Sequence, residues 1–251
     1  MDEDEAARHA ENILAGAPFE PIPGVTDLHS GYWVQAAITT AMAEHLEGFG
    51  GYKIAWNTPA HMDASGMREP GFGRLFQGRV APTGTVVERG SLRDPGVEPE
   101  IAAVLRADPG PTPDRDKLME SIDKFVPAIE ILDRRGMNPP APPWDMLAQN
   151  IFNAGVVLGF RGLPPEALPD DITTHVEAGG TALHSGPAHP PQNPFDAVAW
   201  LSRMAHVLEC PPKPGDVLLL GSHTPILQID WGQEITVTMD GLGEVRCQFE
   251  G

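Results

Sequence analysis

The sequence predicts an α+β fold, in which a helical segment precedes a body built mainly of β-strands. The first 50 residues carry helix-like patterns, whereas the later part repeatedly shows short runs rich in β-branched residues. The 251 residues also include 27 glycines and 27 prolines spread along the chain, and such frequent breaks favour short elements joined by turns. We expect one domain over residues 1–251, with a helical part at 1–50 and a mixed β body at 51–251.

Two helices are predicted in the helical part and one in the β body. Residues 2–15 form the first, and the second starts near Asp27, whose side chain is suited to accept hydrogen bonds from a first helical turn. The third includes Pro194, a residue favoured in the first turn of a helix. Its apolar face is predicted to comprise Phe195, Val198, Leu201, Met204, Ala205 and Leu208.

The strands of the body are predicted from their β-branched content and from the glycine-containing turns between them. They are expected at 51–56, 84–88, 98–105, 125–132, 153–160, 171–178, 215–221, 233–239 and 243–249. Since the helices mostly precede the strands instead of alternating with them, the pattern is typical of an α+β fold.

The overall charge limits the classes of partner. With 17 basic and 35 acidic residues, the chain carries a formal net charge of −18. A surface of this sign repels nucleic acid and anionic membranes, so we expect neither as a partner. An anionic substrate would be repelled as well, unless its site has local positive charge. A divalent cation beside a lysine would supply that charge.

Neither a secretory signal nor a membrane span is predicted. The N-terminus opens with acidic residues (MDEDEAARHA) where a signal peptide would be basic, and no apolar run approaches the ~18 residues that a membrane helix needs. We therefore expect a cytoplasmic protein. Cys210 and Cys247 have no metal-binding spacing and are expected to be free thiols.

Three glutamates stand inside apolar, strand-like runs. Glu98 and Glu100 are two residues apart, so on a strand their side chains point to the same face, roughly 6–7 Å apart along it. Glu130 stands in a second run, between Ile129 and Ile131. Carboxylates in such surroundings repel one another and resist burial, and a divalent cation would remove both problems. On spacing alone, the alternative of wet faces on edge strands stays open.

Two further residues are candidates for acid–base chemistry. Lys53 lies in the short apolar run GYKIAW, where burial would lower its pKa, although an exposed lysine on an edge strand fits the same pattern. His223 follows the apolar run 215–221, and a histidine exchanges protons near neutral pH. A structural or solvated histidine is the alternative there. The run DMLAQN (145–150) by itself indicates only a capped helical turn.

Taken in order, these motifs resemble those of the 2-keto-4-pentenoate hydratase and 2-oxo acid decarboxylase family, part of the fumarylacetoacetate hydrolase superfamily. The resemblance covers nearly the whole chain. The matching stretches are GYWVQ (31–35), GYKIAWNT (51–58), VEPEIAAVL (97–105), AIEILDRR (128–135), DMLAQN with VVLG (145–159), WLSRMAHVL (200–208) and PGDVLLLGSHT with GQEITVTMDGLGEVRCQF (214–249). The ordered set is specific, although each piece alone is not.

The resemblance implies a mixed β-sandwich roll with N-terminal helices, assembled into homo-oligomers. It also implies a Mg²⁺ or Mn²⁺ ion held by Glu98, Glu100 and Glu130, and an active-site lysine at Lys53. For these four residues it favours the functional interpretation over the structural one.

The chain departs from the family pattern around the expected pocket. Trp56 stands within a segment where relatives carry small or aliphatic residues, and Phe152 adds bulk where small residues are common. Gln149 replaces an acid, and His223 replaces an apolar residue. We therefore expect an intact metal site in a remodelled pocket, with His223 substituting for the lost acid.

The function that the resemblance implies is that of a metal-dependent hydro-lyase. Such an enzyme adds water to an unsaturated 2-oxo (2-hydroxydienoic) acid through a metal-bound enolate. Lys53 and His223 are the expected catalytic residues. The residues expected to bind substrate are Trp56, Asn150, Phe152, Ser222 and Thr224.

Two alternatives remain. A decarboxylase of a 2-oxo dioic acid would use the same metal site and would need a cation for the second carboxylate, which Arg68, Arg74 or Arg79 could supply. A catalytically altered homologue that acts as a binding partner would explain the changed pocket without turnover. The retained glutamates and Lys53 argue against that second alternative.

Overall fold

The computed structural model describes residues 1–138, 140–187 and 193–251. Its helices are α1 (Glu3–Leu14), α2 (Leu28–His45), α3 (Pro59–Ser65), α4 (Arg115–Ser121), α5 (Pro143–Ala148) and α6 (Pro194–Val207). None of the helices in these described ranges is long and apolar enough to cross a membrane.

The strands form two sheets. The larger sheet contains β1 (Phe49–Ala55), β2 (Gly71–Phe76), β3 (Val80–Pro82), β5 (Pro95–Leu105), β6 (Ile122–Asp133), β7 (Asn153–Leu158), β10 (Val217–Ser222) and β11 (Leu227–Gln228). The smaller sheet contains β4 (Thr85–Val87), β8 (Thr173–Ala178), β9 (Thr181–Pro187), β12 (Glu234–Met239) and β13 (Gly243–Phe249). The strand orders are β2-β1-β10-β5-β6-β7-β3, with β11 beside β5, and β4-β13-β12-β8-β9.

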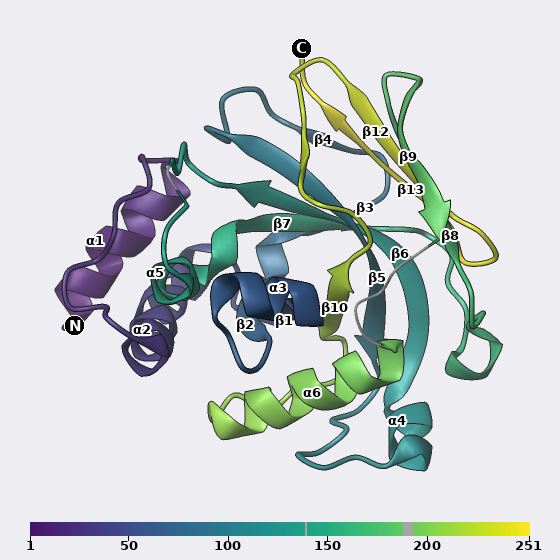
Figure 1. Cartoon of the computed structure of the whole chain (residues 1–251), viewed down its shortest axis with the longest axis horizontal. Coiled ribbons are helices and arrows are strands. Elements are labelled where there is room, and N and C mark those ends of the chain that lie inside the picture. Colours follow the sequence, from purple (N-terminus) through teal and green to yellow (C-terminus); the bar gives the residue numbers. More distant parts are fainter. Residues whose placement is uncertain (139, 188–192) are drawn as a thin grey trace.

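Both sheets are mixed, which confirms the expected α+β class. In the larger sheet β1 runs parallel to β10 but antiparallel to β2, and in the smaller sheet β13 runs parallel to β4 but antiparallel to β12. Helices α1, α2 and α5 gather beside β2, while α6 lies apart from them and packs against β1 and β10 (Figure 1). Buried residues of both sheets and of α6 form the main core.

The helix starts follow the residues that the sequence indicated. The Asp27 side chain accepts a hydrogen bond from the Ser30 backbone nitrogen at 2.8 Å, and the Ser30 hydroxyl accepts one from the Asp27 nitrogen at 3.1 Å. This reciprocal pair is a capping box, which satisfies N–H groups that a helix start would otherwise leave unpaired. Pro194 opens α6, whose predicted apolar face is buried at Phe195, Val198 and Leu201.

The sequence patterns did not indicate several elements, among them α3, α4, β2 and β9. Strand β2 reads GFGRLF, and its two glycines weaken the β signal. Strand β9 is exposed along most of its length and so lacks the alternation of a half-buried strand. These elements depend on tertiary contacts that local patterns do not contain.

Candidate metal centre

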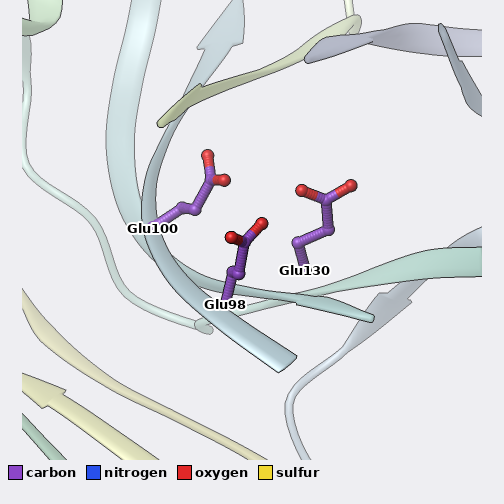
Figure 2. Close-up of side chains that lie close together, drawn as sticks. All are labelled: Glu98, Glu100 and Glu130. Carbon is purple, nitrogen blue, oxygen red and sulfur yellow. The ribbon is translucent and has the colours of Figure 1, made fainter. Parts of the chain in front are cut away.

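Three carboxylates converge where β5 and β6 pair. Glu98 and Glu130 are direct cross-strand partners, and Glu100 lies two residues further along β5 on the same face. One oxygen from each side chain lies within 4.8 Å of an oxygen from each of the other two. Figure 2 shows the three side chains pointing into the same space. Oxygen ligands in this number and type suit Mg²⁺ or Mn²⁺.

The electrostatics of this cluster are unfavourable without a cation. Glu100 and Glu130 are 1% and 0% exposed, while part of Glu98 reaches the surface of a cavity. Burial, and next the charge of Glu130, raise the pKa of Glu98 to about 8. The same two causes hold the pKa of Glu100 well above its usual range. A divalent cation would favour the ionised carboxylates and offset their repulsion.

Glu130 is held in place by two donors and keeps one oxygen unused. Its Oε1 accepts hydrogen bonds from Lys53 Nζ at 2.6 Å and from Asn153 Nδ2 at 2.8 Å. Its buried Oε2 has no hydrogen-bond partner among the described residues. Buried carboxylate oxygens are normally satisfied, so an oxygen in this state fits a metal ligand.

Lys53 is buried at 2% exposure and also donates to the Ile151 carbonyl at 3.3 Å. Burial by itself lowers the pKa of Lys53, but the surrounding glutamates, Glu130 above all, raise it beyond its ordinary value. The lowered pKa expected from burial alone is therefore wrong, because that expectation left out the neighbouring charges. Lys53 is a charged ammonium in this site.

Two glycines of β2 make room for the side chains of β1 and the residue after it. Gly73 is the cross-strand partner of Lys53, and a Cβ on Gly73 would lie 2.8 Å from Lys53 Cγ. A Cβ on Gly71 would lie 2.7 Å from the Trp56 ring. The same two glycines that weaken the β signal of this strand therefore leave space for the side chains of Lys53 and Trp56.

A cavity of about 360 Å³ opens beside the carboxylates, within the usual size range of small-molecule sites. Five of the residues expected from the sequence line it together with Glu98 and Glu100. They are Lys53, Trp56, Phe152, Ser222 and Thr224. The Ser222 hydroxyl donates to the Thr224 carbonyl at 2.6 Å, and the Thr224 hydroxyl donates to the Pro225 carbonyl at 2.8 Å. The Ser222 oxygen also accepts a hydrogen bond from the Thr224 nitrogen at 3.3 Å, so both hydroxyls take part in local contacts of this segment.

Asn150, expected to bind substrate, has a structural position. It is not among the described residues that line the cavity, and its side chain is 1% exposed. Its Oδ1 accepts from the Arg74 nitrogen and its Nδ2 donates to the Arg74 carbonyl, both at 2.8 Å. Both ends of its amide are thus bound to the backbone of β2, which gives Asn150 a structural contact. Its binding to a substrate stays a prediction.

His223, expected to be catalytic, points away from the cavity. Its Nδ1 lies 2.7 Å from the hydroxyl of Thr174 on β8, in the smaller sheet. Ser222 and Thr224 on either side of it line the cavity, whereas His223 is not among the described residues that line it. This placement does not support direct proton transfer to a substrate, and His223 has no part in the function proposed below.

Gln149 is likewise not among the described residues that line the cavity. Its Oε1 accepts a hydrogen bond from Arg135 Nη2, and its Nε2 donates to the Glu20 carbonyl at 2.9 Å. These contacts tie α5 to the segment that joins α1 and α2. That His223 replaces an acid at position 149 stays a prediction, although the two side chains make different contacts.

Several contributors to the site escaped sequence analysis. The Gly221 backbone nitrogen donates to Glu100 Oε2 at 2.7 Å, and Asn153 supports Glu130. Arg134 lines the cavity. The period of two along β6 could have indicated Arg134, because residues 130, 132 and 134 share one face of a strand.

A sequence model described as "Fumarylacetoacetate (FAA) hydrolase C-terminal" matches residues 41–250. The chain belongs to the fumarylacetoacetate hydrolase family. It is 31% identical to 2-keto-4-pentenoate hydratase 1 of Dechloromonas aromatica (strain RCB), over 93% of this chain and 90% of the relative. It is 28% identical to 2-oxo-hept-4-ene-1,7-dioate hydratase of Escherichia coli, over 98% and 94% of the two chains.

The fold is likewise that of the fumarylacetoacetate hydrolase family. The structure of 4-oxalocrotonate decarboxylase from Pseudomonas putida G7, complexed with magnesium and adipate, matches with a TM-score of 0.84 and 25% identity. The match covers 99% of this chain and 98% of that one. The family and the fold implied by the sequence motifs are thereby confirmed.

Proposed function

We propose that this member of the fumarylacetoacetate hydrolase family is a Mg²⁺- or Mn²⁺-dependent hydro-lyase that acts on an unsaturated 2-oxo acid. The observation that carries the proposal is the convergence of Glu98, Glu100 and Glu130 around one space, with Lys53 bound to Glu130 and a cavity alongside. The hydratases among its relatives support the reaction type.

The three glutamates are the residues that would hold the cation, and the unused Oε2 of Glu130 fits that role. When bound, the cation supplies Lewis-acid stabilisation of the negative charge that develops on a 2-oxo acid as it enolises. Asn153 and the Gly221 nitrogen fix the orientation of two of the ligands before the cation arrives.

Lys53 supplies fixed positive charge at the same place. Its ammonium donates to Glu130 Oε1 and to the Ile151 carbonyl, which leaves one of its three N–H groups for a substrate oxygen. Because the surrounding glutamates raise the pKa of Lys53, its ammonium is suited to pair with the negative charge of a substrate.

Apolar side chains provide another part of the cavity wall. Trp56, Leu132 and Phe152 line the cavity, and the exposed part of this wall is mostly apolar in character. Such a wall packs against the hydrocarbon part of a substrate and limits the access of water to the reacting atoms.

Decarboxylation of a 2-oxo dioic acid is the second candidate. The close structural match to a 4-oxalocrotonate decarboxylase favours it, because the match extends over nearly the whole of both chains. Both reactions pass through an enolised 2-oxo acid and would use the same glutamates and Lys53.

The test is turnover by the full chain with Mg²⁺, with Mn²⁺ and with a chelator. A panel of 2-hydroxydienoic acids, with and without a second carboxylate, is followed by loss of dienol absorbance and by mass spectrometry of the products. Metal-dependent gain of water supports the hydro-lyase, whereas loss of carbon dioxide supports the decarboxylase. Tight metal binding without turnover of any acid in the panel would instead favour a binding partner.

A further inference from the structure

A second cation faces the cavity at a distance from Lys53. Arg134 follows β6 directly, and Leu132 and Arg134 both line the cavity, on the strand face that carries Glu130. Arg134 lies four positions after Glu130, which in extended chain corresponds to roughly 13 Å between their Cα atoms. A ligand held at the glutamates and extended along β6 would approach Arg134.

The guanidinium of Arg134 is only partly satisfied by its neighbours. Its Nη2 donates to Gln228 Oε1 at 2.9 Å and lies 3.2 Å from Asp94 Oδ2. The hydrogen bonds of its guanidinium all come from Nη2, and its Nη1 makes none to the residues that the structure describes. Guanidinium groups have five donors in a planar fork that matches a carboxylate, so Arg134 has capacity for a further anion.

The other arginines considered for this role lie elsewhere. Arg74 stacks on the Phe49 ring at 4.8 Å, Arg79 lines a separate cavity beside Gln149, and Arg68 lines a groove beside Trp200. Arg134 is the only arginine among the described residues that line the metal-side cavity. A ligand whose far end is a methyl group would place apolar atoms against this cation and leave its donor unused.

We propose that Arg134 is a second anion-binding point of this cavity and selects 2-oxo acids that carry another carboxylate at the far end of the chain. The inference rests on the proposed function, since the first carboxylate is taken to lie at the cation held by the glutamates. It makes Arg134 a specificity-determining residue, and a 2-oxo dioic acid the preferred class of substrate.

The experiment compares two ligands of equal carbon number, 2-oxoadipate and 2-oxohexanoate, which differ at the far end. Binding to the Mg²⁺-loaded full chain is measured by calorimetry for wild type, for Arg134→Gln and for Arg106→Gln. Arg106 is the matched control, because it forms an exposed ion pair with Asp123 and does not line the cavity.

Wild type and Arg106→Gln should bind 2-oxoadipate about tenfold or more tightly than 2-oxohexanoate, as one charge-assisted contact allows. Arg134→Gln should lose this preference and keep its affinity for 2-oxohexanoate and for Mg²⁺. If Arg134→Gln does not fold, Arg134→Lys replaces it, since lysine keeps the charge beside Asp94 but lacks the fork. The preference should then fall severalfold.

The outcomes separate this inference from the function on which it rests. Equal Mg²⁺-dependent affinity of wild type for both acids, or a preference that survives in Arg134→Gln, would overturn the role of Arg134 alone. If neither acid binds in a Mg²⁺-dependent manner, the proposed function fails and the inference fails with it.

Discussion

The side-chain amide of Asn150 pairs with both backbone polar groups of Arg74, each at 2.8 Å. This two-point contact fastens the 3₁₀ turn η2 (Asn150–Phe152) to β2, which stands at the end of the larger sheet's strand order. All three residues of the turn have positive φ, at 56°, 48° and 64°. Such conformations cost energy in residues other than glycine and persist only where the surroundings fix them. This conformation of the turn directs the Ile151 carbonyl at Lys53 and places Phe152 at the cavity.

Asn150→Ala should therefore lower the free energy of unfolding by about 2–4 kcal/mol, since it leaves the buried N–H and C=O of Arg74 unpaired. Chemical denaturation measures the change. Asn12→Ala is the control, because Asn12 lies exposed on α1 and its loss should change the free energy by no more than about 0.5 kcal/mol. A loss at position 150 no larger than that of the control would show that the two hydrogen bonds do not hold the turn.

Loss of the metal ligand Glu130 should weaken Mg²⁺ binding more than loss of Asn153, which only orients that ligand. Asn153→Ala, which removes the hydrogen bond that Asn153 donates to Glu130, should weaken Mg²⁺ binding by roughly 10–100-fold. Glu130→Gln should weaken it more than that and abolish turnover. Glu88→Gln serves as the control for loss of one negative charge outside this cluster. Isothermal calorimetry with Mg²⁺ and Mn²⁺ measures all three variants, and unchanged affinity in Glu130→Gln would rule out the assigned metal centre.

The pH dependence of stability should reveal the buried carboxylates. The pKa of Glu98 rises from an ordinary value of 4.5 to about 8 in the folded chain, through burial and the charge of Glu130. The folded state thus binds this proton more tightly than the unfolded state does. The resulting stabilisation is complete below pH 4.5 and is lost as the pH rises through about 8.

Metal binding should show the opposite trend, because the cation requires ionised ligands and its binding releases protons. The rise in the thermal unfolding midpoint on addition of Mg²⁺ should therefore grow across the same pH interval. In Glu98→Gln, the part of this pH dependence that comes from Glu98 should disappear. Midpoints recorded with Mg²⁺ and with chelator at several pH values give the comparison. A Mg²⁺ effect that is constant with pH would contradict raised pKa values for these glutamates.

Phe152 should set the length and shape of the preferred substrate. It lines the metal-side cavity, and its ring meets that of Phe19 edge-on at 5.7 Å on the other side. We expect 2-hydroxypenta-2,4-dienoate, which is too short to contact this wall fully, to be handled poorly compared with longer acids. Phe152→Ala should raise KM for the longer acids by about tenfold through loss of apolar contact, with a smaller effect on kcat. Equal kcat/KM for short and long acids in wild type would contradict this account.

Strands β5 and β6 show which features could be predicted from the sequence and which could not. The apolar runs predicted both strands, and the period of two placed Glu98 and Glu100 on one face, as the structure has them. The direct pairing of Glu98 with Glu130 was not predicted, because strand register depends on contacts between distant segments. The two-point contact of Asn150 was out of reach for the same reason, since it joins positions 76 residues apart.

His223 gives the last prediction, because its side chain faces the smaller sheet while its neighbours face the cavity. Its Nδ1 lies 2.7 Å from the Thr174 hydroxyl, and both residues are buried. His223→Ala should therefore lower the free energy of unfolding by about 1–3 kcal/mol, while kcat per folded molecule stays close to that of wild type. Thr174→Val removes the same contact from the other side, so the double variant should lose less stability than the sum of the two single variants. Denaturation curves and active-site titration give both quantities. A large fall in kcat in a fully folded His223→Ala variant would restore this histidine to the reaction and contradict the direction in which the structure points it.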